Sequence, residues 1–140
     1  MVDLKQRFKA LSEWIGSPID LSKGAIRLQL GEFGPWWLEL DPGASMLTIQ
    51  HTVARFSEPD AKHWLALNTD LRLLGGAWLG LHLPSSTVRL MLHLDLDRFD
   101  ATDLVNVMGN LLELRAELPM PLSETEEPTA AGAPENFMSV

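Results

Sequence analysis

The spacing of hydrophobic residues changes several times along the chain, and each change marks a predicted element. Near the N-terminus the apolar residues recur every three or four positions, as on one face of a helix. Asp3 is a suitable N-cap for this helix, and Gly16 with Pro18 ends it. The predicted stripe consists of Leu4, Phe8, Leu11 and Ile15.

From Ala25 onward the period falls to two, which is typical of strands with one buried face. Three successive strands are predicted, at residues 25–30, 35–40 and 46–53. A turn with two glycines at residues 31–34 and an Asp-Pro-Gly turn at residues 41–43 join them. Because these turns are short, consecutive strands should pair antiparallel.

A second helical pattern, residues 57–74, ends at a pair of glycines. Two further strands are predicted at residues 77–83 and 87–96, and Asp100 then caps a last helix that reaches about residue 118. The element order is α-β-β-β-α-β-β-α, in which strands come in runs instead of alternating singly with helices. This order predicts an α+β fold with an antiparallel sheet packed against helices.

The C-terminal segment differs from the rest in composition. Residues 119–140 contain four prolines and four Glu but no Lys or Arg. Few large apolar side chains are present to offset the entropy lost on ordering. We therefore predict one folded domain over residues 1–118 and a disordered acidic tail over residues 119–140.

The second and third predicted helices are apolar on more than one side. Leu65 and Leu73, for example, lie off the main stripe of the second helix. A two-layered domain of this size has little interior in which to bury a helix on both sides. A homodimer seam with twofold symmetry accounts for the excess. Cover by loops or by the other helices is the alternative.

Two adjacent tryptophans indicate a binding surface. Trp36 and Trp37 are neighbours on one predicted strand, so their side chains point to opposite faces of the sheet. One should enter the core, and the other should lie among polar side chains. An exposed Trp close to Phe33, in the preceding turn, is the kind of anchor that binding surfaces use. Cover of this Trp by the first helix is the alternative.

Composition and charge exclude several classes of protein. The chain has 140 residues, is 46% hydrophobic and contains no cysteine, which excludes disulfides and thiolate chemistry. Its formal charge of −8 disfavours nucleic-acid binding. No apolar run is long enough for a membrane span, and the N-terminus does not resemble a signal peptide. We therefore expect a cytoplasmic protein that does not insert into membranes.

No set of residues predicts catalysis or metal binding with any specificity. His82, His93 and Asp95 are the best metal-ligand candidates, but they need a favourable strand register. Asp100 and Asp103 are better explained as a helix cap and a first-turn charge than as part of a calcium loop. We expect no enzyme activity, no cofactor and no metal.

This small, acidic, cysteine-free α-β-β-β-α-β-β-α domain resembles the class I type III secretion chaperones of Gram-negative bacteria, the Tir-chaperone-like family, most specifically in its second half. The similarity covers about residues 1–118, whereas Pro35 and the Trp36-Trp37 pair depart from the family pattern. The segments that carry the similarity are Leu71-Arg72-Leu73-Leu74-Gly75-Gly76, Trp78-Leu79-Gly80-Leu81, Val88-Arg89-Leu90-Met91-Leu92 and the helix at 104–118.

This resemblance implies a homodimeric chaperone that serves virulence. Its client would be the N-terminal segment of a secreted effector, bound in extended form and partly as an added strand. The secretion ATPase is a further candidate partner. The resemblance implies a dimer interface at Trp64, Leu67, Leu71, Leu74 and Trp78. The effector-binding residues expected from the resemblance and from the exposed turn are Phe8, Leu11, Ile15, Leu28, Leu30, Phe33, Trp36 and Leu38. The alternative function is an acidic immunity or antitoxin-like protein that inhibits a basic partner.

Overall fold

The computed structural model describes residues 4–41, 43 and 45–122. In this part of the chain five strands form one antiparallel sheet in the order β1-β2-β3-β5-β4. The strands are β1 (Ala25–Gln29), β2 (Pro35–Leu40), β3 (Met46–Arg55), β4 (Trp78–His82) and β5 (Thr87–Asp95). The helical elements are α1 (Leu4–Arg7), α2 (Lys9–Ile15), the 3-10 turn η1 (Glu58–Asp60), α3 (Ala61–Leu67), α4 (Leu71–Leu74) and α5 (Ala101–Glu117).

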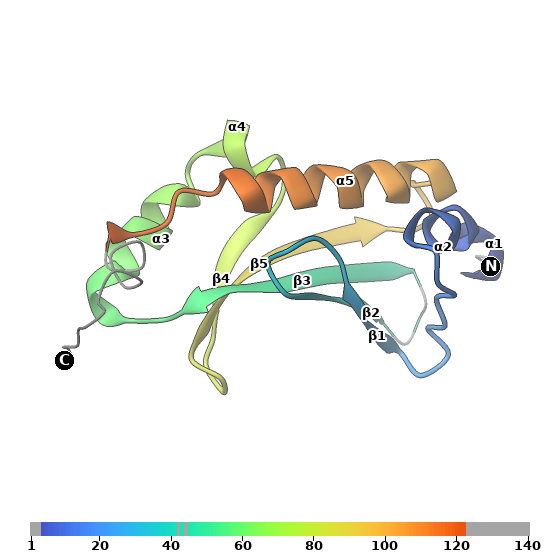
Figure 1. The fold of residues 1–140 in the computed structure, drawn as a ribbon, viewed down its shortest axis with the longest axis horizontal. Coiled ribbons are helices and arrows are strands. Elements are labelled where there is room, and N and C mark those ends of the chain that lie inside the picture. Colours follow the sequence, from blue (N-terminus) through green and yellow to red (C-terminus); the bar gives the residue numbers. More distant parts are fainter. Residues whose placement is uncertain (1–3, 42, 44, 123–140) are drawn as a thin grey trace.

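The long helix α5 lies across one face of the sheet, with α2 beside its N-terminal end and α3 and α4 towards its C-terminal end (Figure 1). Alternation along each strand directs one set of side chains towards α5. In register across the sheet, this set includes Ile26, Leu38, Ile49 and Leu92 in one row and Leu28, Trp36, His51, Leu90 and Leu79 in the next. The buried apolar members of this set form the core with Leu104, Met108 and Leu111 of α5, and Ile26 and Leu92 pack against it.

The predicted order and the antiparallel α+β architecture are confirmed. Boundaries agree to within one or two residues at every strand. Asp100 caps α5 as predicted: its carboxylate accepts from the Asp103 N–H at 2.9 Å, and the Asp103 carboxylate accepts from the Asp100 N–H at 3.0 Å. The predicted N-cap Asp3 and residues 123–140 of the predicted tail lie outside the described residues.

The second predicted helix is divided, and short polar side chains explain why. Asn68 turns its side chain away from the helix axis to β4, and Thr69 Oγ1 donates to the Ala66 carbonyl at 2.8 Å. Asp70 then caps α4 by accepting from the Leu73 N–H at 3.1 Å. Gly75 ends α4 with φ of 55°, a left-handed conformation that suits glycine.

The chain continues to pack beyond α5. Leu118 is buried, Met120 packs partly against the core, and the Pro119 carbonyl lies 2.7 Å from His63 Nε2. These contacts attach the end of the described chain to α3.

Ser86, in the turn between β4 and β5, has φ of 55°, a conformation that costs a non-glycine residue about 1–2 kcal/mol. Ser86→Gly is expected to raise the free energy of unfolding by up to about 1 kcal/mol, because glycine's extra chain entropy offsets part of the relief. Ser85→Gly in the same turn is the matched control. It removes a hydroxyl 2.7 Å from both His82 Nδ1 and Thr87 Oγ1 and is expected to lower stability. Urea unfolding followed by circular dichroism measures both effects.

Candidate protein-binding surfaces

The sheet face opposite α5, here called the open face, carries Trp37, Met91 and Trp78 among polar side chains. Trp36 is 1% exposed whereas Trp37 is 39% exposed, so the two tryptophans take opposite faces as predicted. The described part of the first helix therefore does not cover Trp37. The row that crosses all five strands in register consists of Arg27, Trp37, Gln50, Met91 and Trp78.

Hydrogen bonds fix the polar side chains of the open face. The Gln50 amide donates to Glu39 Oε1 at 2.6 Å and accepts from Arg89 Nη1 at 2.8 Å. His93 lies 2.9 Å from Thr48 Oγ1, and its ring contacts the Trp78 ring at a centroid distance of 4.9 Å. The open face is thus a pre-ordered surface on which Trp37 remains accessible.

The β1–β2 turn presents Phe33, which is 43% exposed, over a buried polar cluster. The Arg115 guanidinium lies 4.3 Å from the centre of the Phe33 ring, a cation–π contact. Arg115 Nε donates to His51 Nε2 at 3.0 Å. The His51 ring stacks on the Trp36 ring with 4.1 Å between the ring centroids. The exposed Phe33 ring therefore packs on Arg115, which is held by buried residues of the core.

His51 is held in its neutral form. Arginine only donates, so His51 Nε2 must be the acceptor, and Nδ1 carries the proton that is donated to the Pro35 carbonyl at 2.9 Å. Burial lowers the pKa of His51 below its ordinary value of 6.5, and the positive charge of Arg115 lowers this pKa further, whereas the bond to Pro35 acts in the opposite direction.

Acid is therefore expected to destabilise the fold through His51. Below pH 6.5 the unfolded chain binds a proton at this residue and the folded chain does not. The free energy of unfolding therefore falls as the pH drops from 6.5 towards the lower pKa of the folded state. Between pH 7.5 and 5.5 the expected loss is up to about 1.4 kcal/mol. Urea unfolding at the two pH values measures it. His51→Gln should flatten this dependence, and an unchanged slope in that variant would contradict the assignment.

The two edges of the sheet differ. At the β4 edge the Asn68 side chain accepts from the Leu79 N–H at 2.7 Å and donates to the Leu79 carbonyl at 2.8 Å. An amide side chain thus takes the place of a neighbouring strand at this point. At the other edge, no strand of the described chain pairs with the outer side of β1. The β4 edge is therefore occupied at one residue, Leu79, and no further strand of the described chain pairs with either edge.

Beside the β4 edge, exposed leucines surround a small apolar pocket of about 220 Å³ between α3 and β4. Leu65 is 69% exposed, Leu81 is 44% exposed, and both line it. Trp64 also lines the pocket, and its buried indole N–H has no acceptor among the described residues. Leu71 and Leu83, on adjoining segments, are 78% and 76% exposed. We call these four leucines and the pocket the α3–β4 surface.

The structure separates the predicted binding residues into buried and accessible ones. Most of the predicted effector-binding set has almost no exposed surface, because these side chains face α5 or lie beneath it: Phe8, Leu11, Leu28, Trp36 and Leu38. Ile15 and Leu30 are half-buried, and Phe33 is exposed. In the predicted dimer set, Trp64 and Leu74 are buried, Leu67 and Trp78 are half-buried, and Leu71 is exposed. In the folded chain the buried residues serve the core.

Sequence reasoning missed Leu81 and Leu83 as surface residues. The predicted strand at residues 77–83 contains both residues, and its alternation directs Leu81 to the same face as Leu79. That face is covered at Leu79, which is buried, and uncovered at Leu81, because the β4–β5 hairpin extends beyond the helices (Figure 1). No local signal in the sequence marks the point at which the cover ends.

The candidate metal ligands are not brought together. His82 pairs with Thr87 at one end of β5, and His93 lies six residues further along, which corresponds to about 20 Å of strand. Asp95 forms an ion pair with Arg98 at 3.6 Å. Across the described ranges, no three His, Cys, Asp or Glu side chains are grouped as metal ligands. None of the helices described there is long and apolar enough to cross a membrane.

No family model and no curated protein matches the sequence. The fold, however, matches solved structures. A chain of the ExsC–ExsE complex superposes with a TM-score of 0.67 at 15% identity, over 80% of this chain and 87% of that one. A chain of the HopA1–SchA chaperone–effector complex gives 0.64 at 18% identity, over 83% and 96%. A chain of the complex between the Yersinia pestis type III secretion chaperone SycH and a fragment of YscM2 gives 0.62 at 13% identity, over 82% and 98%.

These matches define the class of fold. The chain has a type III secretion chaperone-like fold, as the sequence resemblance implied. The match extends over nearly the whole length of the chains compared, so the fold is shared as a complete domain.

Proposed function

We propose that this protein is a type III secretion chaperone that binds the N-terminal segment of a secreted effector in extended form and keeps it soluble and competent for export. The observation that carries this proposal is the shared fold with chains of chaperone–effector complexes over about four-fifths of this chain. The function requires no catalytic group and no cofactor. The secretion ATPase stays a predicted partner.

The β1 edge is the binding site for the extended segment in this proposal. Its outward N–H and C=O groups offer main-chain hydrogen bonds that do not depend on the client's side chains. Phe33 in the adjoining turn and Trp37 on the open face supply aromatic anchors close to that edge. Backbone pairing would supply general affinity, and the aromatic residues would select among clients.

A second copy of the chain is the proposed partner of the α3–β4 surface. Exposed leucines of this number are unusual on a monomer, and pairing two such surfaces about a twofold axis would bury both. Of the predicted seam this surface contains Trp64 and Leu71, and Leu65, Leu81 and Leu83 are added.

Co-expression with the N-terminal segment of an effector encoded beside this gene tests the client site. The two chains should co-purify, and hydrogen exchange should slow at β1 (Ala25–Gln29) on binding. Phe33→Ala with Trp37→Ala should weaken the complex at least about tenfold. Protection confined to β4 would contradict the assigned edge. Affinity that collapses with added salt would favour the acidic inhibitor of a basic partner.

Sedimentation tests the dimer. Wild-type protein is expected to sediment as a dimer, and Leu71→Glu with Leu81→Glu is expected to give monomers, because two carboxylates per chain would be buried without partners. Trp37→Ser on the open face is the control and should leave the dimer intact. A monomeric wild type at high micromolar concentration would contradict the dimer without affecting the client site.

A further inference from the structure

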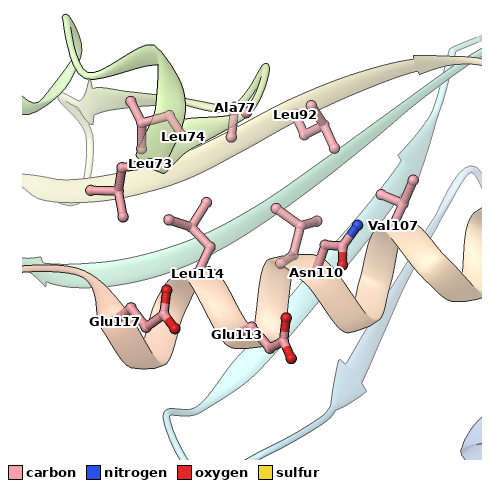
Figure 2. A pocket seen from close by; sticks show the side chains of 11 residues that line it. Leu73, Leu74, Ala77, Leu92, Val107, Asn110, Glu113, Leu114 and Glu117 are labelled. Carbon is pink, nitrogen blue, oxygen red and sulfur yellow. The ribbon is translucent and has the colours of Figure 1, made fainter.

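A second groove lies on the helical side of the molecule, between α5 and the segment from α4 to the start of β4. It has a volume of about 350 Å³. Figure 2 shows Leu73, Leu74, Ala77 and Leu92 on one side, facing Val107 and Leu114 of α5. The proposed strand-binding edge is at β1, the opposite edge of the sheet from β4.

The two walls and the rim differ in chemistry. Val107, Leu111 and Leu114 are spaced four and three residues apart, so they form one apolar stripe along α5. Asn110, Glu113 and Glu117 form the neighbouring stripe and line the outer rim. The groove is therefore an apolar trough with a polar border on its α5 side.

The border is negatively charged. Glu113 and Glu117 are exposed, and neither has an ion-pair partner among the described residues. None of the described residues that line the groove is Lys or Arg. The chain's own residues 123–140 carry four Glu and no basic residue, so this border repels them. An occupant with Lys or Arg next to its apolar residues is complementary.

Backbone N–H groups on both sides of the groove are already bonded within the chain. The N–H groups of Leu74, Gly75 and Ala77 donate to the carbonyls of Asp70, Leu71 and Leu74 respectively. On the other side, the backbone of α5 is bonded within the helix. A strand bound here would leave its own N–H and C=O groups without protein partners, whereas a helix satisfies them internally. The lined part of α5, residues 107–117, is about 15 Å long, or three helical turns.

We propose that this groove binds an amphipathic helix of another protein, with apolar residues at i, i+4 and i+7 and Lys or Arg along their flank. Such a site is separate from the β1 edge, so the protein could hold an extended client and a helical partner at the same time. The apolar stripe of the ligand fills the trough, and its basic residues pair with Glu113 and Glu117.

The test uses a designed helical peptide of three to four turns, stapled, with Leu at i, i+4 and i+7 and flanking Lys, and a twin in which Glu replaces each Lys. The full-length protein is titrated by calorimetry and by methyl NMR. The Lys peptide is expected to bind and to shift the methyl signals of Val107, Leu111 and Leu114. Glu113→Lys with Glu117→Lys should weaken it about tenfold or more. Glu13→Lys with Glu58→Lys, a charge-matched pair of exposed residues elsewhere, should not.

Several results would overturn the proposal. The Lys peptide could fail to bind, or the Glu twin could bind as tightly as the Lys peptide. The control variant could lose as much affinity as Glu113→Lys with Glu117→Lys, or the methyl shifts could be confined to another surface. A wild-type dimer that becomes monomeric in Glu113→Lys with Glu117→Lys would mean that a second copy fills the groove. Glu113 and Glu117 line this groove and are not among the residues assigned to the client site, so effector co-purification should survive these substitutions, which separates the two sites.

Discussion

Trp36→Ala is expected to lower the free energy of unfolding by about 3–5 kcal/mol, whereas Trp37→Ala should change it by less than about 1 kcal/mol. Trp36 is 1% exposed and stacks on His51 at 4.1 Å, so its removal leaves a cavity and loosens the Arg115–His51 cluster. Trp37 is 39% exposed and makes no comparable contact with the core.

Urea unfolding followed by circular dichroism, at one protein concentration, measures both variants. If Trp36→Ala does not fold, Trp36→Phe is the alternative variant. It keeps an aromatic ring and removes an indole N–H that has no acceptor in the described structure. Effector binding should depend on the other tryptophan: Trp37→Ala should weaken effector binding while the protein remains folded. Equal destabilisation by the two alanine variants would contradict the assignment of the faces.

Asn68→Ala is expected to lower the free energy of unfolding by about 1–3 kcal/mol, because the Leu79 N–H and C=O lose both partners at once. It should also open the β4 edge to other strands, which promotes association of partly folded chains. Size-exclusion chromatography at several concentrations should therefore show species larger than the wild type.

Asn106→Ala is the control for Asn68→Ala. Asn106 is exposed on α5, so its loss should leave stability and association nearly unchanged. Asn68→Asp adds a sharper comparison, since a carboxylate can accept from the Leu79 N–H but cannot donate to its carbonyl. A fully stable Asn68→Ala variant without new association would show that this amide does not protect the edge.

The difference between the two sheet edges supports the proposed assignment of one partner to each. One edge is occupied at Leu79 by a side chain of the same chain, and the other lies beside two exposed aromatic residues. A client strand would therefore add at β1, while the α3–β4 surface remains available to a second copy. The cation–π contact of Arg115 with Phe33 connects that client site to a buried histidine, so the stability of the anchor and of the core should change together with pH.

The sequence by itself determined the order of the elements, the antiparallel sheet and the division of Trp36 from Trp37. These depend on local periodicity, on turn glycines and on caps such as Asp100, all of which act within a few residues. It also indicated an excess of apolar surface, but it did not distinguish core residues such as Leu38 from exposed ones such as Leu81.

Only the tertiary structure decided which apolar side chains remain accessible, because burial depends on where α5 and α3 end above the sheet. It also decided that Asn68 reaches Leu79, eleven residues away, and that Arg115 reaches His51, sixty-four residues away. Both contacts join segments whose distance in space is set by the packing of helices on strands, and no local pattern in the sequence encodes that distance.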